Sequence, residues 1–329
     1  MPLGQGYLPA GALGTQLTYI TRRAILDKGI TQIYNSSPLI AGLLANAALE
    51  AGGVDSFMAN VQLAGFVQPQ WTGFQGNFSA ATNVQGLQQA AWSMCWATVP
   101  IPLFGSEILI QDKQKIQDIL ELRLTDTGNA MRDLLAQALY NNTSNVLQIL
   151  GLPAAIDDGT NAANYAGISR TTFPDWQSKR YAMGSVNPTR SLLLQNIAGV
   201  VKAQGEKPDF GIMGPGTWTM AAQDFLGIER YHPNTDRTDE YLTAFEAFEV
   251  AGVPFYMDPY CVEGTVYLIN TNYLVMRVHE EAQWEIIDFT PLTPVNQIGF
   301  LGVAFIVLAL TLTKPKSCAV VTGYNFVTI

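Results

Sequence analysis

The chain of 329 residues is long enough for one large domain or two ordinary ones. Charged residues make up only 14% of it, where a typical soluble domain has about 25%, so we expect other subunits to cover much of its surface. A net charge of −9, with no Lys or Arg between Lys28 and Lys113, excludes a phosphate-binding surface over that region.

Residues 1–54 are predicted to form an N-terminal arm followed by a helix. The opening "MPLGQGYLPAGALG" has no period, no basic start and no continuous apolar run, which favours an extended arm over a signal peptide. The helix is expected in "SSPLIAGLLANAALEAGG", with Ser36 or Ser37 as its N-cap, Pro38 at its first position and Gly52-Gly53 at its end.

Residues 55–107 are predicted to form a long two-stranded extended loop. From Val61 to Gly105 the sequence contains no charged residue or histidine, and its Gly and Pro spacing is typical of strands joined by turns. Its large aromatic residues are the candidates for contacts with a neighbouring subunit: Trp71, Phe74, Phe78, Trp92 and Trp96.

The clearest helix lies at about 112–141, where apolar residues recur at three- and four-residue spacing. At 1.5 Å per residue it would be about 40 Å long. A bundle or coiled-coil helix is the alternative, but no second helix of matching length is predicted. A loop-rich segment follows and completes the region 108–188.

Residues 189–329 begin with a helix in "SLLLQNIAGVVKAQG" and a strand, turn and helix in "PDFGIMGPGTWTMAAQDFLG". Short strands follow in "VPFYMD", "TVYLIN" and "YLVMRVH". The apolar run Ile298–Leu312 is shorter than the 18 or so residues of a spanning helix, so it is predicted to be one or two buried strands. Membrane attachment through 298–312 is a remote alternative. The whole is α+β, without alternating βαβ units.

No residue pattern points to catalysis, a cofactor or a metal. "GIMGPGTW" lacks the Lys-Ser/Thr of a phosphate loop and is predicted to be a tight strand-to-helix turn, and "IDDGTN" is predicted to be a solvated turn. His232 and His279 have no metal-ligand spacing to a cysteine, although folding can bring distant residues together. The three cysteines are predicted to be reduced and structural: Cys95, Cys261 and Cys318.

The predicted elements, taken in their order along the chain, resemble those of the major capsid protein of tailed bacteriophages, which has the Hong Kong 97 fold. The resemblance rests on Gly52-Gly53 before the aromatic loop, the long helix ending in "ALYNN", the segment Tyr165–Ser178, and "VPFYMD" followed by "VYLIN". It implies an extended β-hairpin loop, a peripheral domain with a spine helix (108–188) and an axial domain (189–329). Strands near 275–312 are expected to return to the peripheral domain.

The resemblance also implies how copies meet. The extended loop of such proteins lies across a neighbouring subunit; the alternative is a hairpin packed on its own core. The loop lacks lysine, so the lysine–asparagine crosslink of some family members is excluded. Loops of the axial domain gather around the capsomer axis, where mixed charges pair between neighbours or remain solvated. The residues concerned here are Arg230, Asp236, Arg237 and Asp239.

The implied function is structural: a non-enzymatic shell protein that assembles as pentamers and hexamers into the icosahedral head of a tailed phage. That head encloses double-stranded DNA without binding it specifically, and an acidic chain suits this role. Implied partners are a decoration or cement protein, a scaffolding protein and a portal, with no membrane. The protein would be assembled in the host bacterial cytoplasm and end in the virion. The alternative is an encapsulin-type compartment.

Overall fold

The computed structural model describes residues 37–45, 47–50, 56–63, 86–104, 113–141, 147–204, 206–225, 247–292 and 299–328. The helices and strands are α2 (Pro38–Ala45), β1 (Ala48–Glu50), β2 (Ser56–Gln62), β3 (Leu87–Ser93), β4 (Cys95–Phe104), α4 (Lys113–Tyr140), α5 (Leu152–Ala155), β5 (Asn164–Tyr165), β6 (Ile168–Ser169), η1 (Pro174–Trp176), β7 (Lys179–Val186), α6 (Arg190–Gln204), β8 (Phe210–Met213), α7 (Pro215–Phe225), β9 (Ala247–Val250), β10 (Val253–Met257), β11 (Thr265–Ile269), β12 (Leu274–His279), η2 (Glu280–Ala282), β13 (Glu285–Pro291), β14 (Gly299–Leu312), η4 (Pro315–Ser317) and β15 (Ala319–Tyr324).

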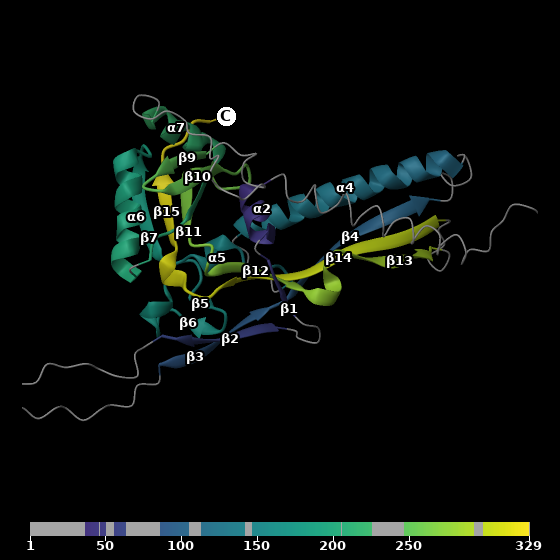
Figure 1. Ribbon diagram of the computed structural model, residues 1–329, viewed down its shortest axis with the longest axis horizontal. Coiled ribbons are helices and arrows are strands. Elements are labelled where there is room, and N and C mark those ends of the chain that lie inside the picture. The colour runs from purple at the N-terminus through teal and green to yellow at the C-terminus, as the bar shows by residue number, and fades with distance from the viewer. Residues whose placement is uncertain are drawn as a thin grey trace, which may run out of the picture.

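Two sheets lie at opposite ends of an elongated molecule (Figure 1). The first is built on β14, the longest strand described. β12 and β13 pair one after the other with one side of β14, β4 pairs with its other side over ten residues, and β1 pairs in parallel with β12. The 28-residue helix α4 runs beside β4 and spans the length of this sheet (Figure 1).

The second sheet has six strands in the order β7-β15-β11-β8-β10-β9. Because neighbouring side chains on a strand point to opposite faces, each strand contributes to two cores. One face packs against helix α6 through Leu193 and Ile197, with Phe255 and Val266 beneath them. The other face belongs to the main core, where Tyr267 lies 6.2 Å from Tyr140 at the C-terminal end of α4, measured between ring centroids.

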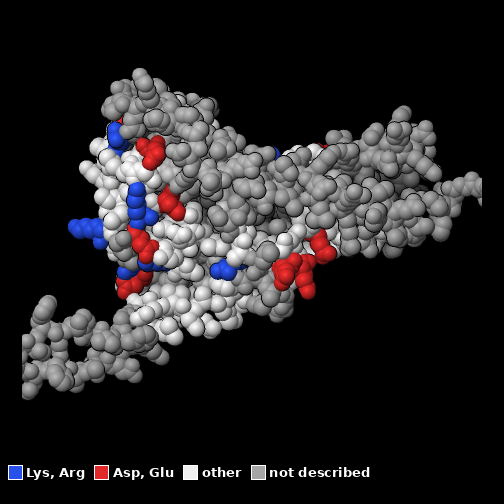
Figure 2. Space-filling model, in the orientation of Figure 1, with Lys and Arg blue, Asp and Glu red and all other residues white. Residues whose placement is uncertain are grey.

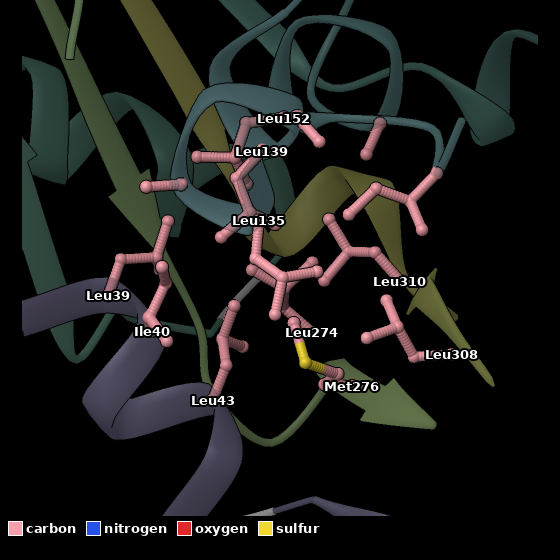
Figure 3. Close-up of a cluster of buried hydrophobic side chains, with 14 of the residues drawn as sticks. Leu39, Ile40, Leu43, Leu135, Leu139, Leu152, Leu274, Met276, Leu308 and Leu310 are labelled. Carbon is pink, nitrogen blue, oxygen red and sulfur yellow. The ribbon is translucent and has the colours of Figure 1, made fainter. Parts of the chain in front are cut away.

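The main core forms where the two sheets and the N-terminal helix meet (Figure 3). Side chains from α2, α4, α5, β12 and β14 converge there: Leu39, Ile40, Leu43, Leu135, Leu139, Leu152, Leu274, Met276, Leu308 and Leu310. Burying each such side chain stabilises the fold by about 1.5–3 kcal/mol. This cluster therefore joins segments that are far apart in the sequence into one body.

A buried carboxylate joins the start of α2 and the end of α4 to the second sheet. Asp258, which follows β10, accepts hydrogen bonds from the hydroxyl of Ser37 and from the Tyr140 hydroxyl (2.9 Å) on one oxygen, and from the Tyr260 amide (3.0 Å) on the other. Burial raises the pKa of Asp258, while the hydrogen bonds from Ser37, Tyr260 and Tyr140 oppose that rise. Ser37 lies at the predicted N-cap position, but its hydroxyl donates to Asp258.

Most elements agree with the sequence-based predictions, including the long helix and the strand–turn–helix of β8 and α7. The helix predicted in residues 36–53 was too long. It ends at Ala45, and Ala48–Glu50 form strand β1 instead, because pairing with β12 outweighs the helix propensity of these residues. The extended loop also ends earlier than predicted, since residues 95–104 belong to the first sheet as β4.

The apolar segment that raised the membrane alternative is strand β14 of the subunit's own sheet, hydrogen-bonded on both sides. Its last nine residues are buried, which accounts for the unbroken apolar run. Within the residues that the structure describes, no helix has the length and apolarity needed to cross a membrane.

Candidate assembly surfaces

Strands β2 and β3 form a two-stranded antiparallel ribbon over seven residues each, from the pair Ser56–Ser93 to the pair Gln62–Leu87. In Figure 1 the ribbon lies along the edge of the molecule that is farthest from α4. This is the base of the extended loop predicted from the sequence. An isolated ribbon of two strands is marginally stable, so its faces need other contacts.

The inner face of the ribbon packs on the body through a row of aromatic rings. Trp92 lies between Phe57 (5.7 Å between centroids) and Tyr165 (6.2 Å, edge-on), and the Arg277 guanidinium lies 4.3 Å from the centre of the Phe57 ring. Aromatic pairs of this kind add about 0.5–1.5 kcal/mol beyond the area that they bury. The row ties the base of the loop to the core at a fixed orientation.

Tyr165 is held in turn by a buried ion pair. Both Arg170 and Asp157 have no exposed side-chain surface, and their charged atoms lie 3.8 Å apart. Arg170 also lies over the Tyr165 ring, at 5.1 Å from its centre. Burial raises the pKa of Tyr165 to about 12, and its hydroxyl accepts a hydrogen bond from the Leu312 amide of β14. The ring therefore sits between the loop base and the sheet.

Both charges of the pair are satisfied locally. One Asp157 oxygen accepts the amides of Gly159, Asn161 and Ala162 at 2.9–3.0 Å, and the other lies 3.4 Å from Arg180. The Arg170 guanidinium donates to the backbone oxygens of Ala155, Ala162 and Trp176. The prediction of a solvated turn at "IDDGTN" holds for Thr160 and Asn161, which are exposed, but it is wrong for Asp157, which is buried. The sequence analysis did not predict this pair. One signal was available: Arg170 lies among the aromatic residues Tyr165, Phe173 and Trp176 in a chain with few charges, which favours a buried arginine.

The outer face of the ribbon is exposed and carries no charge. Met58 and Leu87 are 56% and 50% exposed, and the other side chains on this face are small or amide-bearing: Ser56, Asn60, Gln62, Gln89, Ala91 and Ser93. Figure 2 shows no Lys, Arg, Asp or Glu on the white surface at the bottom of the body, where Figure 1 has this ribbon. The lack of charge on this face is a property that it shares with the interior of subunit contacts.

A second set of exposed apolar side chains lies on the first sheet. Trp96 and Phe104 on β4 are 65% and 44% exposed, and Ile287 on β13 is 52% exposed on the same face. The opposite face of β4 is buried with α4 through Ile101 and Leu103.

The sequence-predicted contact residues divide into three groups. Trp96 is exposed and stacks on Phe305 with centroids 5.4 Å apart, so it remains a candidate. Trp92 is only 1% exposed and is a core residue of its own subunit, because β3 turns it towards Tyr165. The others lie outside the described residues: Trp71, Phe74, Phe78, Arg230, Asp236, Arg237 and Asp239.

The described residues contain no candidate metal site. No cluster of three His, Cys, Asp or Glu side chains is found among them. All three cysteines are buried as free thiols, and burial raises the pKa of Cys95 and, to about 11, that of Cys318. Thiols with such pKa values are protonated and poor nucleophiles at neutral pH. His279 caps the turn after β12 by accepting the Glu281 amide.

Comparison with known proteins agrees with this architecture. No protein-family model and no curated protein matches the sequence. The fold is similar to a chain of the cyanophage A-1(L) capsid, with a TM-score of 0.66, 15% identity, and 88% of this chain and 93% of that chain covered.

Two further solved structures share the arrangement. The SrpI encapsulin of Synechococcus elongatus PCC 7942 gives a TM-score of 0.59 at 12% identity, covering 87% of this chain and 89% of that one. The capsid of a native GTA particle gives 0.56 at 11% identity, covering 87% and 90%. The chain thus has the α+β Hong Kong 97-type fold, which is common to capsid and encapsulin subunits.

Proposed function

We propose that this protein is a structural subunit of a closed icosahedral shell, and specifically the major capsid protein of a tailed phage. The observation that carries the proposal is the Hong Kong 97-type fold over most of the chain, combined with an uncharged outer face of the ribbon and exposed apolar side chains on the first sheet. Surfaces of this kind are costly on a free monomer and are stabilised when copies of the subunit cover them.

In this proposal, identical subunits associate as pentamers and hexamers through non-covalent contacts. The ribbon and the sheet face around Trp96 supply contacts in the described part of the chain. Trp71, Phe74 and Phe78 are proposed to continue the contact on the neighbour, and Arg230, Asp236, Arg237 and Asp239 to pair around the capsomer axis. The absence of lysine from the loop leaves packing and hydrogen bonds to hold the shell.

The shell is proposed to enclose double-stranded DNA without binding it tightly. A net charge of −9 disfavours tight binding of phosphate, so the genome would be confined and not bound. Assembly would take place in the bacterial cytoplasm with a scaffolding protein and a portal, and a decoration or cement protein would reinforce the uncrosslinked virion.

The test is to express the full chain, separate the products by sedimentation and image them by electron microscopy. We expect uniform closed particles, or rings of five and six subunits. Trp71→Asp should abolish them while leaving the circular dichroism spectrum of the subunit unchanged. A protein that stays monomeric at every concentration would rule the shell out.

A second candidate is an encapsulin-type compartment, supported by the similarity to the SrpI encapsulin. The two candidates differ in their contents. Particles from the native source, treated with nuclease and then opened, should release DNA if the protein is a phage capsid. Release of a co-packaged protein and no DNA would favour the compartment.

A further inference from the structure

The loop between β10 and β11, residues 258–264, connects the second sheet to α4, the helix that runs beside the first sheet. We infer that this loop is a joint that fixes the angle between the two sheets, and that this angle sets the curvature of the shell. The part that concerns curvature rests on the proposed function. The part that concerns the angle is a property of the single subunit and is tested without assembly.

The joint holds α4 at two points. The Tyr140 hydroxyl, at the end of α4, donates to the Asp258 carboxylate at 2.9 Å. In the opposite sense, the Tyr260 hydroxyl of the loop donates to the Asp133 carboxylate of α4 at 2.6 Å. Asp133 and Tyr140 are about two turns apart on the helix, so both side chains lie on the same face of it. The loop and the helix thus each contribute one tyrosine and one carboxylate.

The loop is anchored in turn on the second sheet and its helix α7. At the start of the loop, the Tyr260 amide donates to Asp258 at 3.0 Å. At its end, the Glu263 carboxylate accepts the Gly216 and Thr217 amides at 2.9 and 3.0 Å. These amides are at the N-terminus of α7, where they have no partner within the helix and where a negative charge is favourable. Because the loop is held at both ends, it transmits the position of the second sheet to α4.

The two hydrogen bonds add what the apolar contacts beside them lack, which is direction. The packing of Tyr140 on Tyr267 is stabilised by burial, and burial has no preferred direction. A hydrogen bond weakens steeply when its geometry is disturbed. The two points of attachment on α4 are about 10 Å apart along the helix axis. A pair of directional contacts at this spacing resists a tilt of the helix that a single contact permits.

A small tilt at the joint becomes a large displacement at the far end of the molecule. Helix α4 has 28 residues and spans the length of the first sheet (Figure 1). At 1.5 Å per residue it is about 40 Å long, so a tilt of about 5° moves its far end by roughly 3.5 Å. In a closed assembly of identical subunits the same tilt occurs in every copy, and it changes the curvature at which the shell closes.

The first test measures the angle in the dissociated subunit. Asp126 on α4 and Lys202 on α6 are exposed, and the three native cysteines are buried, so cysteines introduced at these two positions can be labelled selectively. Electron paramagnetic resonance should give one narrow distribution of distances between two nitroxide labels. Adding Tyr140→Phe and Tyr260→Phe together should shift or broaden this distribution. An unchanged distribution would overturn the joint, whatever the protein assembles into.

Single variants separate the joint from a general loss of stability. Tyr260→Phe removes only a hydroxyl from a partly exposed side chain, so it should shift the distances while the circular dichroism spectrum stays unchanged. Asp133→Asn keeps an oxygen that accepts the Tyr260 hydroxyl and should retain the narrow distribution. Tyr273→Phe is the matched control, because it removes a 2.9 Å hydrogen bond to Glu206 that does not involve α4. Equal shifts in Tyr260→Phe and Tyr273→Phe would overturn the inference.

The second test measures the shell. Particles of Tyr260→Phe, imaged by electron microscopy, should have a shifted or broader range of diameters than particles of the wild type and of Tyr273→Phe. Particles of unchanged size, from a variant whose label distances have moved, would overturn the link to curvature and leave the proposed shell standing. Absence of particles from the wild type would overturn the proposed function and the link to curvature with it, while the label distances would still decide the joint.

Discussion

The two faces of the β2–β3 ribbon are made from the same kinds of uncharged residue but have different surroundings. On the inner face, Trp92 is 1% exposed and packs between Phe57 and Tyr165. On the outer face, Met58 directly follows Phe57 and is 56% exposed. The lack of charge in this stretch therefore serves two purposes. One face completes the core of the chain, and the other is exposed and is the face that we propose contacts a neighbouring copy.

The comparison predicts that inner-face changes act on the folding of the subunit and outer-face changes act on assembly. The following variants are ranked by their expected effect on the free energy of unfolding of the dissociated subunit, which urea denaturation measures.

Arg170→Met should have the largest effect. It removes the cation that supports Tyr165 and leaves the buried Asp157 carboxylate short of a partner, at a cost of about 4 kcal/mol. Arg180→Met is the matched control, since that side chain is partly exposed and makes a single 3.4 Å contact with the same carboxylate. It should cost less than about 1 kcal/mol. Equal losses would mean that burial of Arg170 does not matter.

Trp92→Ala should follow, at about 3 kcal/mol, because it leaves a cavity between Phe57 and Tyr165. Trp96→Ala is its control on the neighbouring strand, where the ring is 65% exposed. We expect it to change the free energy of unfolding by about 1 kcal/mol or less. If Trp96 proved as costly as Trp92, the assignment of Trp92 alone to the core would be wrong.

The junction at Asp258 should make folding depend on pH, whereas the outer face of the ribbon has no group that titrates. Burial raises the folded pKa of Asp258 above its unfolded value of about 3.9, so the folded subunit binds the proton more tightly. This group's contribution to stability is therefore complete below the unfolded pKa and is lost as the pH rises through the folded pKa. The difference in unfolding free energy between wild type and Asp258→Asn should fall over that interval. A difference that is constant with pH would contradict the raised pKa.

Met58→Glu together with Leu87→Glu should have the smallest effect on folding, within about 0.5 kcal/mol, because both side chains already lie in solvent. Among these variants, the double Glu variant should impair assembly most. Each copy of the contact would bury carboxylates that have no partner of opposite charge. Sedimentation of the variant, with Met58→Leu as control, checks this. Normal particles from the Glu variant would remove the outer face from the contact.

The sequence led to the right kind of element wherever the pattern was long or strongly periodic, as for the helix near 112–141 and the apolar run of β14. It failed for Ala48–Glu50, where three residues with helix propensity gain more from pairing with β12. It failed again at Asp157, because the two arginines that compensate its buried charge, Arg170 and Arg180, lie 13 and 23 residues further along the chain.

By itself, the sequence determined that this chain has a charge-free, aromatic segment and a long amphipathic helix, and that no metal or catalytic pattern stands out. Local periodicity and composition are sufficient for such conclusions, because they reflect which residues leave water. Only the tertiary structure decided that Trp92 faces inward while Met58 faces outward. The direction of a side chain or an amide depends on which strand pairs with which, and that pairing is set by contacts distant in the sequence.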